Sequence, residues 1–372
     1  MRELAVGLMS GTSLDGIDAA LVRISPTPEL ELLAFRIVPF TESVRSTICS
    51  VLSHGSVREV ALLHVQLGEL FGAAALAVVR QAGVSPGDLS LVASHGQTVW
   101  HEPRRGSLQL GDPSVIAERV GVRVVSDFRS RDVAAGGEGA PLVPIADVYL
   151  FGHEKHGRVL LNVGGMANVT WVPLRGQEDG VIAFDTGPGM AVIDAVVRHF
   201  DPSASCDVEG RLAEQGEPQL EVLEEFLGNQ YFVAPPPKST GREVFGSSFA
   251  EQLIERVITV RSGASAADCV ATATALTARS IASAIELWIP QIGTCDLLVS
   301  GGGCRNVALM GMLREHLGGV NVVEFAREFF DGDAKEAAAF AYLGWLTVNG
   351  RSGNLPAATG ARGPRVLGTV TG

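Results

Sequence analysis

The sequence lacks any long run of basic residues, and lysine is especially scarce. Acidic residues number 41 against 29 basic residues, of which only three are lysine, so the formal net charge at pH 7 is −12. A chain of this charge repels a polyphosphate backbone, which argues against nucleic acid as a partner. A small anionic ligand remains compatible, because a few arginines and backbone N–H groups are enough to form a local site.

Cysteine motifs and long apolar runs are also missing. The five cysteines are scattered, with no C-x-x-C pair and no histidine at metal-ligand spacing, so we expect free thiols in a reducing compartment. No segment approaches the roughly 18 to 20 apolar residues that span a bilayer, and the first residues lack the apolar region of a signal peptide. The expectation is a soluble, cytoplasmic protein without a membrane partner.

Length and composition indicate an α/β protein with two domains. The 372 residues exceed one ordinary domain, and a hydrophobic fraction of 46% with 44 glycines suits two full cores joined by tight loops. Strands and helices alternate through both halves, which predicts two α/β domains that face a shared cleft. We place the N-terminal lobe at residues 1–140, with 346–372 packing back on it, and the C-terminal lobe at 141–345.

A glycine-rich β-hairpin pattern occurs in both halves. Residues 4–9 form an apolar strand pattern, 10–16 a polar turn and 17–24 a second apolar strand pattern. Residues 158–172 repeat this order of strand, glycine-rich tip and strand. The two segments share a pattern more than an identity, so chance competes with duplication. We favour duplication.

Apolar periodicity defines most of the remaining elements. Helices are predicted at residues 56–82, 142–151, 190–200, 266–288 and 306–316, and strands at 89–93, 180–184 and 297–300. The strand at 89–93 leads into a loop at 94–98 that carries His95 and Gln97. The strand at 180–184 delivers Asp185 to its end.

Three glycine-rich segments follow predicted strands, where α/β folds place ligands. The tip at 10–16 offers consecutive N–H groups that suit phosphate oxygens, although it has no Gly-Lys-Ser/Thr Walker signature and such turns are usually plain hairpins. The segment 301–303 allows close approach of a flat ligand such as adenosine, or forms a tight strand-to-helix turn. Neither segment identifies a ligand by itself.

Asp185, which begins the third segment, is the most informative single residue. It is followed by Thr-Gly-Pro-Gly, which holds a carboxylate beside exposed backbone donors. Such a carboxylate binds Mg²⁺ through water or abstracts a proton. The alternative is an N-cap for the next helix, which is less natural across the intervening residues. We therefore favour a functional role for Asp185.

Long motifs run through the whole chain in order. They occupy residues 7–18, 94–98, 101–103, 127–129, 131–137, 139–144, 161–165, 184–189, 237–243, 300–303, Glu336 and 359–365. Two phosphate-type loops from duplicated halves, with a glycine-rich floor, resemble the actin, hexokinase and Hsp70 superfamily, which implies a two-lobed ribonuclease H-like fold and ATP but no particular substrate. The full set of motifs is similar to that of the anhydro-N-acetylmuramic acid kinase family.

The resemblance implies a reaction and its cofactors. ATP, 1,6-anhydro-N-acetylmuramic acid and water give N-acetylmuramic acid 6-phosphate and ADP, a step of peptidoglycan recycling. Asp185 matches the family's base, which takes a proton from the water that attacks the anomeric carbon, while the freed O6 attacks the γ-phosphate. ATP and Mg²⁺ are the implied cofactors and an amino sugar is the implied substrate. We also expect a homodimer.

The resemblance also implies site residues. Nucleotide contacts are expected at Gly11, Thr12, Ser13, Leu14, Asp15, Gly16, Ile17, Asp18, Gly164, Gly165, Gly187, Gly189, Gly301, Gly302 and Gly303. Substrate contacts are expected at Arg131, Glu336, His95 and Gln97. The ligands of the Mg²⁺ ion are not identified by the motifs.

Several of these residues have structural alternatives. Arg131 could instead form a surface ion pair with Asp132 or Glu138, and Glu336 could pair within its own helix. A histidine in a loop more often satisfies backbone carbonyls than binds a ligand. This favours a structural role for His95. Lys238 hints weakly at a point charge near phosphate, because the chain otherwise uses arginine.

One residue departs from the family pattern, and two other functions stay open. Met190 stands where the family usually has Asn, so a hydrogen bond near the Asp185 loop is lost or replaced, although the base and glycines remain. A kinase for another amino sugar or hexose on the same fold would leave the anhydro bridge intact. An actin-like ATP-switched protein would hydrolyse ATP without any sugar.

Overall fold

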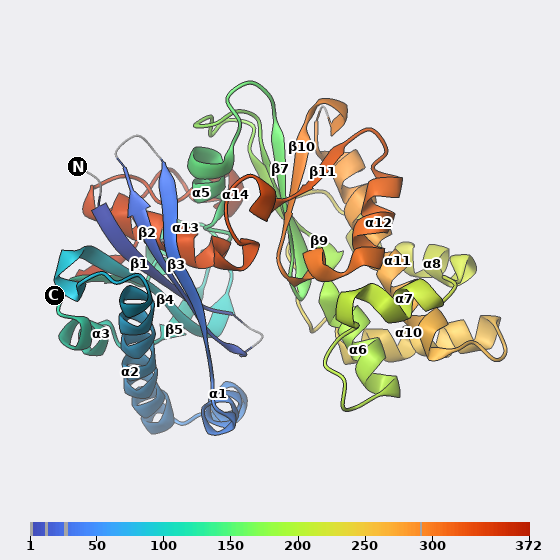
Figure 1. Ribbon diagram of the computed structural model, residues 1–372, viewed down its shortest axis with the longest axis horizontal. Helices are drawn as coiled ribbons and strands as arrows, with labels where there is room; N and C mark the ends of the chain where they lie inside the picture. The colour runs from blue at the N-terminus through green and yellow to red at the C-terminus, as the bar shows by residue number, and fades with distance from the viewer. Residues whose placement is uncertain (1–2, 12–13, 26–28, 291) are drawn as a thin grey trace. The chain divides into compact units, whose positions relative to one another are not determined.

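The chain forms two compact units, each with its own β-sheet (Figure 1). The computed structural model describes residues 3–11, 14–25, 29–290 and 292–372. The first unit comprises Met1–Phe151 and Asp333–Gly372, and the second comprises Gly152–Gly332. Residues 141–151 and 333–345 therefore belong to the first unit, whereas the sequence analysis assigned them to the C-terminal lobe.

The first unit is built on a seven-stranded sheet. Its strands are β1 (Glu3–Ser10), β2 (Gly16–Ile24), β3 (Leu30–Pro39), β4 (Leu89–Glu102), β5 (Gly106–Leu110), β6 (Val124–Ser126) and β12 (Thr369–Thr371), in the order β12-β6-β4-β1-β2-β3 with β5 paired to β4. Strands β1, β2 and β3 are antiparallel, whereas β4 runs parallel to β1 and β6 parallel to β4. The predicted first hairpin is confirmed by the pairing of β1 with β2.

Helices cover both faces of this sheet. They are α1 (Glu42–His54), α2 (Val57–Gln81), α3 (Pro113–Val120), α4 (Ser130–Ala134), α5 (Pro144–Ala146), α13 (Lys335–Val348) and α14 (Pro356–Thr359). Val6 and Leu8 of β1 share a core with the buried face of α2. Gly7 points to the other face, because side chains alternate along a strand. A Cβ at Gly7 would overlap the carbonyl oxygen of Ala337, so α13 packs on that face.

Helix α2 is long and apolar enough to cross a membrane by length and composition, but half of its apolar window is buried inside the unit. Its N-terminus is fixed by a capping box between Ser56 and Glu59. Leu63, Leu67 and Phe71 are fully or almost fully buried in the core against the sheet. The hydropathy of α2 is thus that of a helix packed in a protein core.

The second unit repeats the strand arrangement of the first. Its strands are β7 (Arg158–Val163), β8 (Met166–Val172), β9 (Ile182–Pro188), β10 (Asp296–Ser300) and β11 (Asn321–Glu324), in the order β11-β10-β7-β8-β9. Strands β7, β8 and β9 are antiparallel, and β10 runs parallel to β7 and β11. Order and directions match β6-β4-β1-β2-β3 of the first unit, as duplication predicts.

Two helices pack on the second sheet, and the others form a helical cluster beside it. The helices are α6 (Met190–Phe200), α7 (Arg211–Gln215), α8 (Leu220–Leu227), α9 (Gln230–Val233), α10 (Ser247–Val260), α11 (Ala266–Trp288) and α12 (Val307–His316). Val159 and Leu161 of β7 share a core with Ile281 of α11 and Leu313 of α12. Helices α6, α8 and α10 share a second core with α11. The predicted helices at 190–200 and 266–288 are confirmed.

Two strands are longer than the sequence analysis predicted. Strand β4 continues to Glu102, so His95 and Gln97 lie within a strand and not in a loop, because β5 folds back and pairs with this extension. Strand β9 continues to Pro188, so Asp185 lies inside a strand, opposite Asn168 and next to a register shift. The predicted helix at 142–151 consists of α5 followed by one π-helical turn.

Among the glycines described in the first unit, Gly7 leaves the least room for a side chain. Gly7→Ala should lower the free energy of unfolding by about 3 kcal/mol, because the added methyl group forces β1 and α13 apart. Chemical denaturation followed by circular dichroism measures this loss.

Gly311 provides a control with the opposite sign. It lies on the exposed side of α12, and a Cβ there meets no atom within 4 Å. Gly311→Ala should therefore raise the free energy of unfolding by roughly 0.5–1 kcal/mol through helix propensity. Equal stability of the Gly7→Ala protein and the wild type would contradict the packing described for β1 and α13.

Candidate functional site

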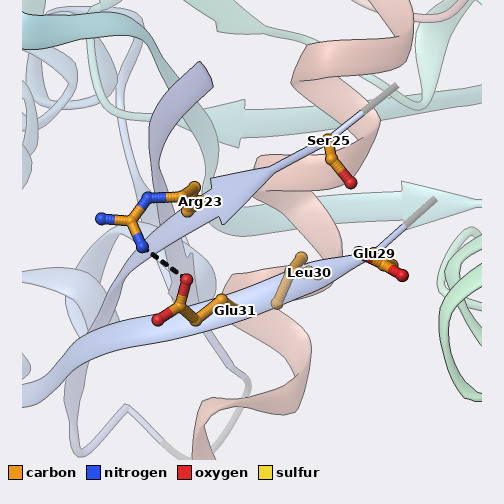
Figure 2. Close-up of a pocket in the computed structure, with 5 residues that line it drawn as sticks. All are labelled: Arg23, Ser25, Glu29, Leu30 and Glu31. Atoms are coloured by element: carbon orange, nitrogen blue, oxygen red, sulfur yellow. Dashed lines mark hydrogen bonds and ion pairs between the residues drawn. The ribbon is translucent and has the colours of Figure 1, made fainter. Parts of the chain in front are cut away.

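A small pocket lies at the end of the β2–β3 hairpin where the chain passes from β2 to β3, away from the glycine motifs. Figure 2 shows its lining residues, which are Arg23, Ser25, Glu29, Leu30 and Glu31. Arg23 and Glu31 form an ion pair across the two strands. Because β2 runs for nine residues from Gly16, the pocket is roughly 25 Å from the tip at 10–16. The pocket is therefore separate from the candidate site formed by the motif residues.

The first glycine-rich tip joins β1 to β2. Thr12 and Ser13, two expected nucleotide contacts, lie outside the described residues. Leu14 adopts a positive φ of 58°, and its carbonyl oxygen accepts a hydrogen bond from Arg45 Nε at 3.1 Å. The side chains of Leu14 and Ile17 are buried in the core. These two residues therefore offer a ligand only their backbone.

Gln97 supports this tip from the neighbouring strand. Its Oε1 accepts a hydrogen bond from Ser10 Oγ at 2.7 Å, and its Nε2 donates to the Gly11 carbonyl oxygen at 3.3 Å. The side chain is fully buried. Gln97 was expected to contact the substrate, and this expectation needs correction, because both ends of its amide are used within the protein to hold the tip.

Carboxylates gather where β2 leaves the tip. Burial, and then the charges of Asp15, Glu336 and Asp333, together raise the pKa of Asp18 from 3.8 to about 7. Carboxylates that repel one another favour the binding of a hard divalent cation, which prefers oxygen ligands. Among the described residues, no three acidic, histidine or cysteine side chains converge closely enough to enclose a metal. The donor set therefore fits a cation that keeps much of its water and shares its other positions with phosphate.

His95 and Arg129 form a buried pair that sequence reasoning missed. Burial, and then the Arg129 charge, lower the pKa of His95 well below 6.5, so the imidazole is neutral. Its Nε2 accepts from Arg129 Nη2 at 2.8 Å, and its Nδ1–H donates to the Gly96 carbonyl oxygen at 2.9 Å. Arg129 Nη1 donates to the Gly139 carbonyl oxygen at 2.8 Å. His95 Nε2 thus orients the guanidinium, and the bond from Nδ1–H to Gly96 leaves Nε2 as the acceptor.

Glu336 lies in the electrostatic field of this guanidinium. Burial raises the pKa of Glu336, and Lys335 and Arg129 oppose the rise. Burial lowers the pKa of Arg129 to about 10, which Glu336 opposes. Lys335 Nζ lies 2.9 Å from Asp147 Oδ1, so the adjacent ammonium is paired with a different carboxylate. In the first unit, the desolvated Glu336 carboxylate and the desolvated Arg129 guanidinium therefore interact electrostatically.

Arg131 is exposed, and the two ion pairs considered for it do not form. The Asp132 carboxylate accepts hydrogen bonds from Gly139 N, Asn354 Nδ2 and Thr359 Oγ1, at 2.7–2.8 Å. Glu138 pairs instead with Arg104 at 3.3 Å. Among the described residues, neither carboxylate holds the Arg131 guanidinium, which leaves its side chain available to an anion.

In the second unit, the glycine tip at 164–165 and the segments at 187–189 and 301–303 come together at one edge of the sheet. The N–H groups of Gly189 and Ala191 donate to the Gly165 carbonyl oxygen at 3.0 Å, and Met190 N–H donates to Gly164 at 2.8 Å. A Cβ at Gly303 would overlap Val163, directly before Gly164. The Gly189 N–H is therefore engaged within the protein. At position 190, where the family usually has Asn, Met190 makes its hydrogen bond through its backbone N–H.

Asp185 is held by three hydrogen bonds in this unit. Thr240 N–H donates to Asp185 Oδ2 at 2.9 Å, Tyr231 Oη donates to the Asp185 carbonyl oxygen at 2.8 Å, and Asp185 N–H donates to the Lys238 carbonyl oxygen at 3.0 Å. Burial raises the pKa of Asp185 to about 6, the Thr240 N–H opposes this rise, and Glu243 adds to it. An oriented carboxylate with this pKa is ionised at neutral pH and is a stronger base than an ordinary aspartate.

The alternative role for Asp185, that of a helix cap, is excluded. Helix α6 has Gly189 at its N-cap position, and no side chain caps it. The carboxylate of Asp185 bonds to Thr240, a residue far away in the sequence. Asp185 is thus oriented by a separate loop and not by the helix that follows it.

Arg242 and Asp194 are two further residues that sequence reasoning missed. A Cβ at Gly165 would lie 3.9 Å from Arg242 Nη2, so this guanidinium lies beside the second glycine tip. Burial raises the pKa of Asp194 to about 6, and Arg198 and Arg242 oppose the rise. The motif at 237–243 contained Arg242, but a motif match gives no role to each member.

Comparison with known proteins agrees with the motif pattern. The family model for anhydro-N-acetylmuramic acid kinase matches residues 3–372. Three curated relatives carry that name: one from Caldanaerobacter subterraneus subsp. tengcongensis is 42% identical over 100% of this chain and 97% of its own length, one from Gloeobacter violaceus is 43% identical over 99% and 98%, and one from Bacillus cereus is 40% identical over 98% and 98%. The chain belongs to the anhydro-N-acetylmuramic acid kinase family.

Proposed function

We propose that this protein is an ATP-dependent kinase that converts 1,6-anhydro-N-acetylmuramic acid and water to N-acetylmuramic acid 6-phosphate, with release of ADP. Family membership over residues 3–372 supports the activity and places it in peptidoglycan recycling. The observation that carries the mechanism is Asp185, a partly buried carboxylate with a pKa near 6 that is fixed by the Thr240 N–H.

The proposed chemistry has Asp185 as general base. Its carboxylate takes a proton from water as the water oxygen bonds to the anomeric carbon of the sugar. The bond between that carbon and the bridging O6 breaks, O6 bonds to the γ-phosphorus of ATP, and the bond from phosphorus to ADP breaks. The coupling avoids release of a free alkoxide, because phosphorus captures O6 as it leaves.

Backbone groups at the glycine segments form the proposed nucleotide site. The set keeps the residues predicted from the motifs, namely residues 11–18 and Gly164, Gly165, Gly187, Gly189, Gly301, Gly302 and Gly303. Their proximity at one edge of the second sheet supports the part of this set that lies in the second unit. Arg242 joins it, because its guanidinium lies beside Gly165 and suits phosphate.

Mg²⁺ is part of the proposal, and the residues suited to it surround Asp18. The elevated pKa of Asp18 and the adjacent charges of Asp15, Asp333 and Glu336 are the observations that fit a hydrated cation. When bound, Mg²⁺ supplies positive charge to the phosphate oxygens. Asp18 is the residue whose ionisation should respond most to the metal.

The proposed sugar contacts are Arg131 and Glu336. Arg131 has an exposed guanidinium that suits the lactyl carboxylate of the sugar or the γ-phosphate. Glu336 suits a sugar hydroxyl, and burial raises its pKa against the charges of Lys335 and of Arg129, which His95 holds in place. The cytoplasmic location, the homodimer and the absence of nucleic-acid and membrane partners remain predictions. The net charge of −12 supports the absence of nucleic acid.

Isotope labelling of a base variant tests the mechanism directly. Wild-type protein with ATP, the anhydro sugar and ¹⁸O-labelled water should place label at the anomeric carbon and phosphate on O6. Asp185→Asn should slow both events together by at least about 100-fold, because a general base is worth that much or more. Mass spectrometry of the product measures both.

Two outcomes would contradict this proposal. Near-normal turnover by the Asp185→Asn protein would show that another group is the base. A phosphorylated product that keeps its anhydro bridge would indicate a simple sugar kinase on the same fold.

The pH dependence of kcat/KM follows from the pKa of the base. Asp185 must be ionised, so kcat/KM should be half-maximal near pH 6 and should fall roughly tenfold for each further pH unit below that. An ordinary aspartate, with a pKa of 3.8, would keep its activity to about pH 4. Asp194→Asn is the control, because that carboxyl has a similar pKa and no proposed role in the reaction.

Glu336→Gln tests which substrate this carboxylate serves. The KM for the anhydro sugar should rise about tenfold, because a charged hydrogen bond is weakened, whereas the KM for ATP should change less than about twofold. Steady-state kinetics with each substrate varied in turn separates the two. Glu118→Gln, an exposed substitution on α3, should change neither value. A selective rise in the KM for ATP would move Glu336 to the nucleotide side.

A further inference from the structure

The side chain of Lys238 lies on the short helix next to Asp185 and not on an open surface. Its Nζ donates to the Tyr231 carbonyl oxygen at 2.8 Å and to the Phe232 carbonyl oxygen at 3.2 Å. The ammonium also lies 4.7 Å from the centre of the Tyr231 ring. Burial lowers its pKa, as expected for a cation partly removed from water. The ammonium therefore joins the segment at 238–240 to helix α9.

Both segments that Lys238 joins also hold Asp185. From α9, Tyr231 Oη donates to the Asp185 carbonyl oxygen. From the other segment, the Lys238 carbonyl oxygen accepts the Asp185 N–H, and Thr240 N–H donates to Asp185 Oδ2. The ammonium thus closes a ring of contacts around one carboxylate. Without it, two carbonyl oxygens lose a donor and the segment that carries Thr240 loses its anchor.

We propose that Lys238 is a positioning residue for the reaction, which keeps the Thr240 N–H on the Asp185 carboxylate and so sets the orientation and basicity of the base. The proposal rests on the proposed function, in which Asp185 is the base. It corrects the expectation that Lys238 supplies charge to phosphate, because its ammonium is bound to backbone carbonyls.

Lys238→Met keeps the length and apolar bulk of the side chain and removes only its charge and donors. The hydrogen bond from Thr240 favours the ionised form of Asp185, and the variant should lose part of it. The pKa of Asp185 should then rise, so the acid limb of kcat/KM should move to higher pH by about half a unit or more. The value of kcat at its pH optimum should fall about tenfold, because the base is misplaced. Both KM values should stay within about twofold.

Matched variants separate positioning from general damage. Lys155→Met is the same substitution at an exposed lysine of the same unit, and it should leave the pH profile unchanged. Lys238→Arg keeps a cation but not the compact shape of the ammonium, so it should restore only part of kcat and part of the position of the limb. Lys238→Gln removes the charge with a polar side chain and replaces Lys238→Met if that protein does not fold, with the same shift expected.

The outcome that overturns the proposal is an acid limb of Lys238→Met at the wild-type pH, whether kcat falls or not, since a purely structural role leaves the basicity of Asp185 unchanged. An equal shift in Lys155→Met overturns it as well. Asp185→Asn, measured in the same assay, reports on the proposed function alone. Activity of that variant removes Asp185 as the base, whereas an inactive Asp185→Asn with an unshifted Lys238→Met rejects only the role of Lys238.

Discussion

The hydrogen bond from Thr240 N–H to the Asp185 carboxylate is the interaction on which the site depends. Burial alone would drive this acid toward its neutral form, and a fully hydrated acid would be too weak a base. The N–H offsets part of the burial and fixes one oxygen, so the pKa comes to about 6. Strand β9 fixes the position of Asp185. The loop that carries Thr240, from elsewhere in the same unit, adjusts the ionisation state of its carboxylate.

The first unit uses the opposite electrostatic arrangement. Burial, and then the charges of three other acids, drive the Asp18 carboxylate toward its neutral form. Arg129 is oriented by a neutral histidine whose own pKa is depressed. Both arrangements are unfavourable until a ligand of opposite charge arrives. A chain of net charge −12 can therefore attract an anionic nucleotide, because the attraction of a fixed guanidinium is local.

The fold was largely predictable, and the side-chain roles were not. Hairpins, long helices and the duplication follow from apolar periodicity, which is a local property, and α6 and α11 were predicted to the residue. Gln97 was misassigned because its partners come from another strand, which no local pattern reports. Arg129 and Arg242 were missed because an arginine inside a motif looks the same whatever it contacts. The hydrogen bond of Arg129 to His95 and the place of Arg242 beside Gly165 arise only after folding.

Lysine usage shows how much a scarce residue can reveal. Of the three lysines, Lys335 is almost fully buried against Asp147, and Lys238 is anchored to two backbone carbonyls. Only Lys155 is exposed. A compact ammonium can point its donors at acceptors that do not lie in one plane, whereas a planar guanidinium needs a matching flat partner. Lys335 and Lys238 therefore occupy sites of fixed, non-planar geometry, and Lys238 does so beside Asp185.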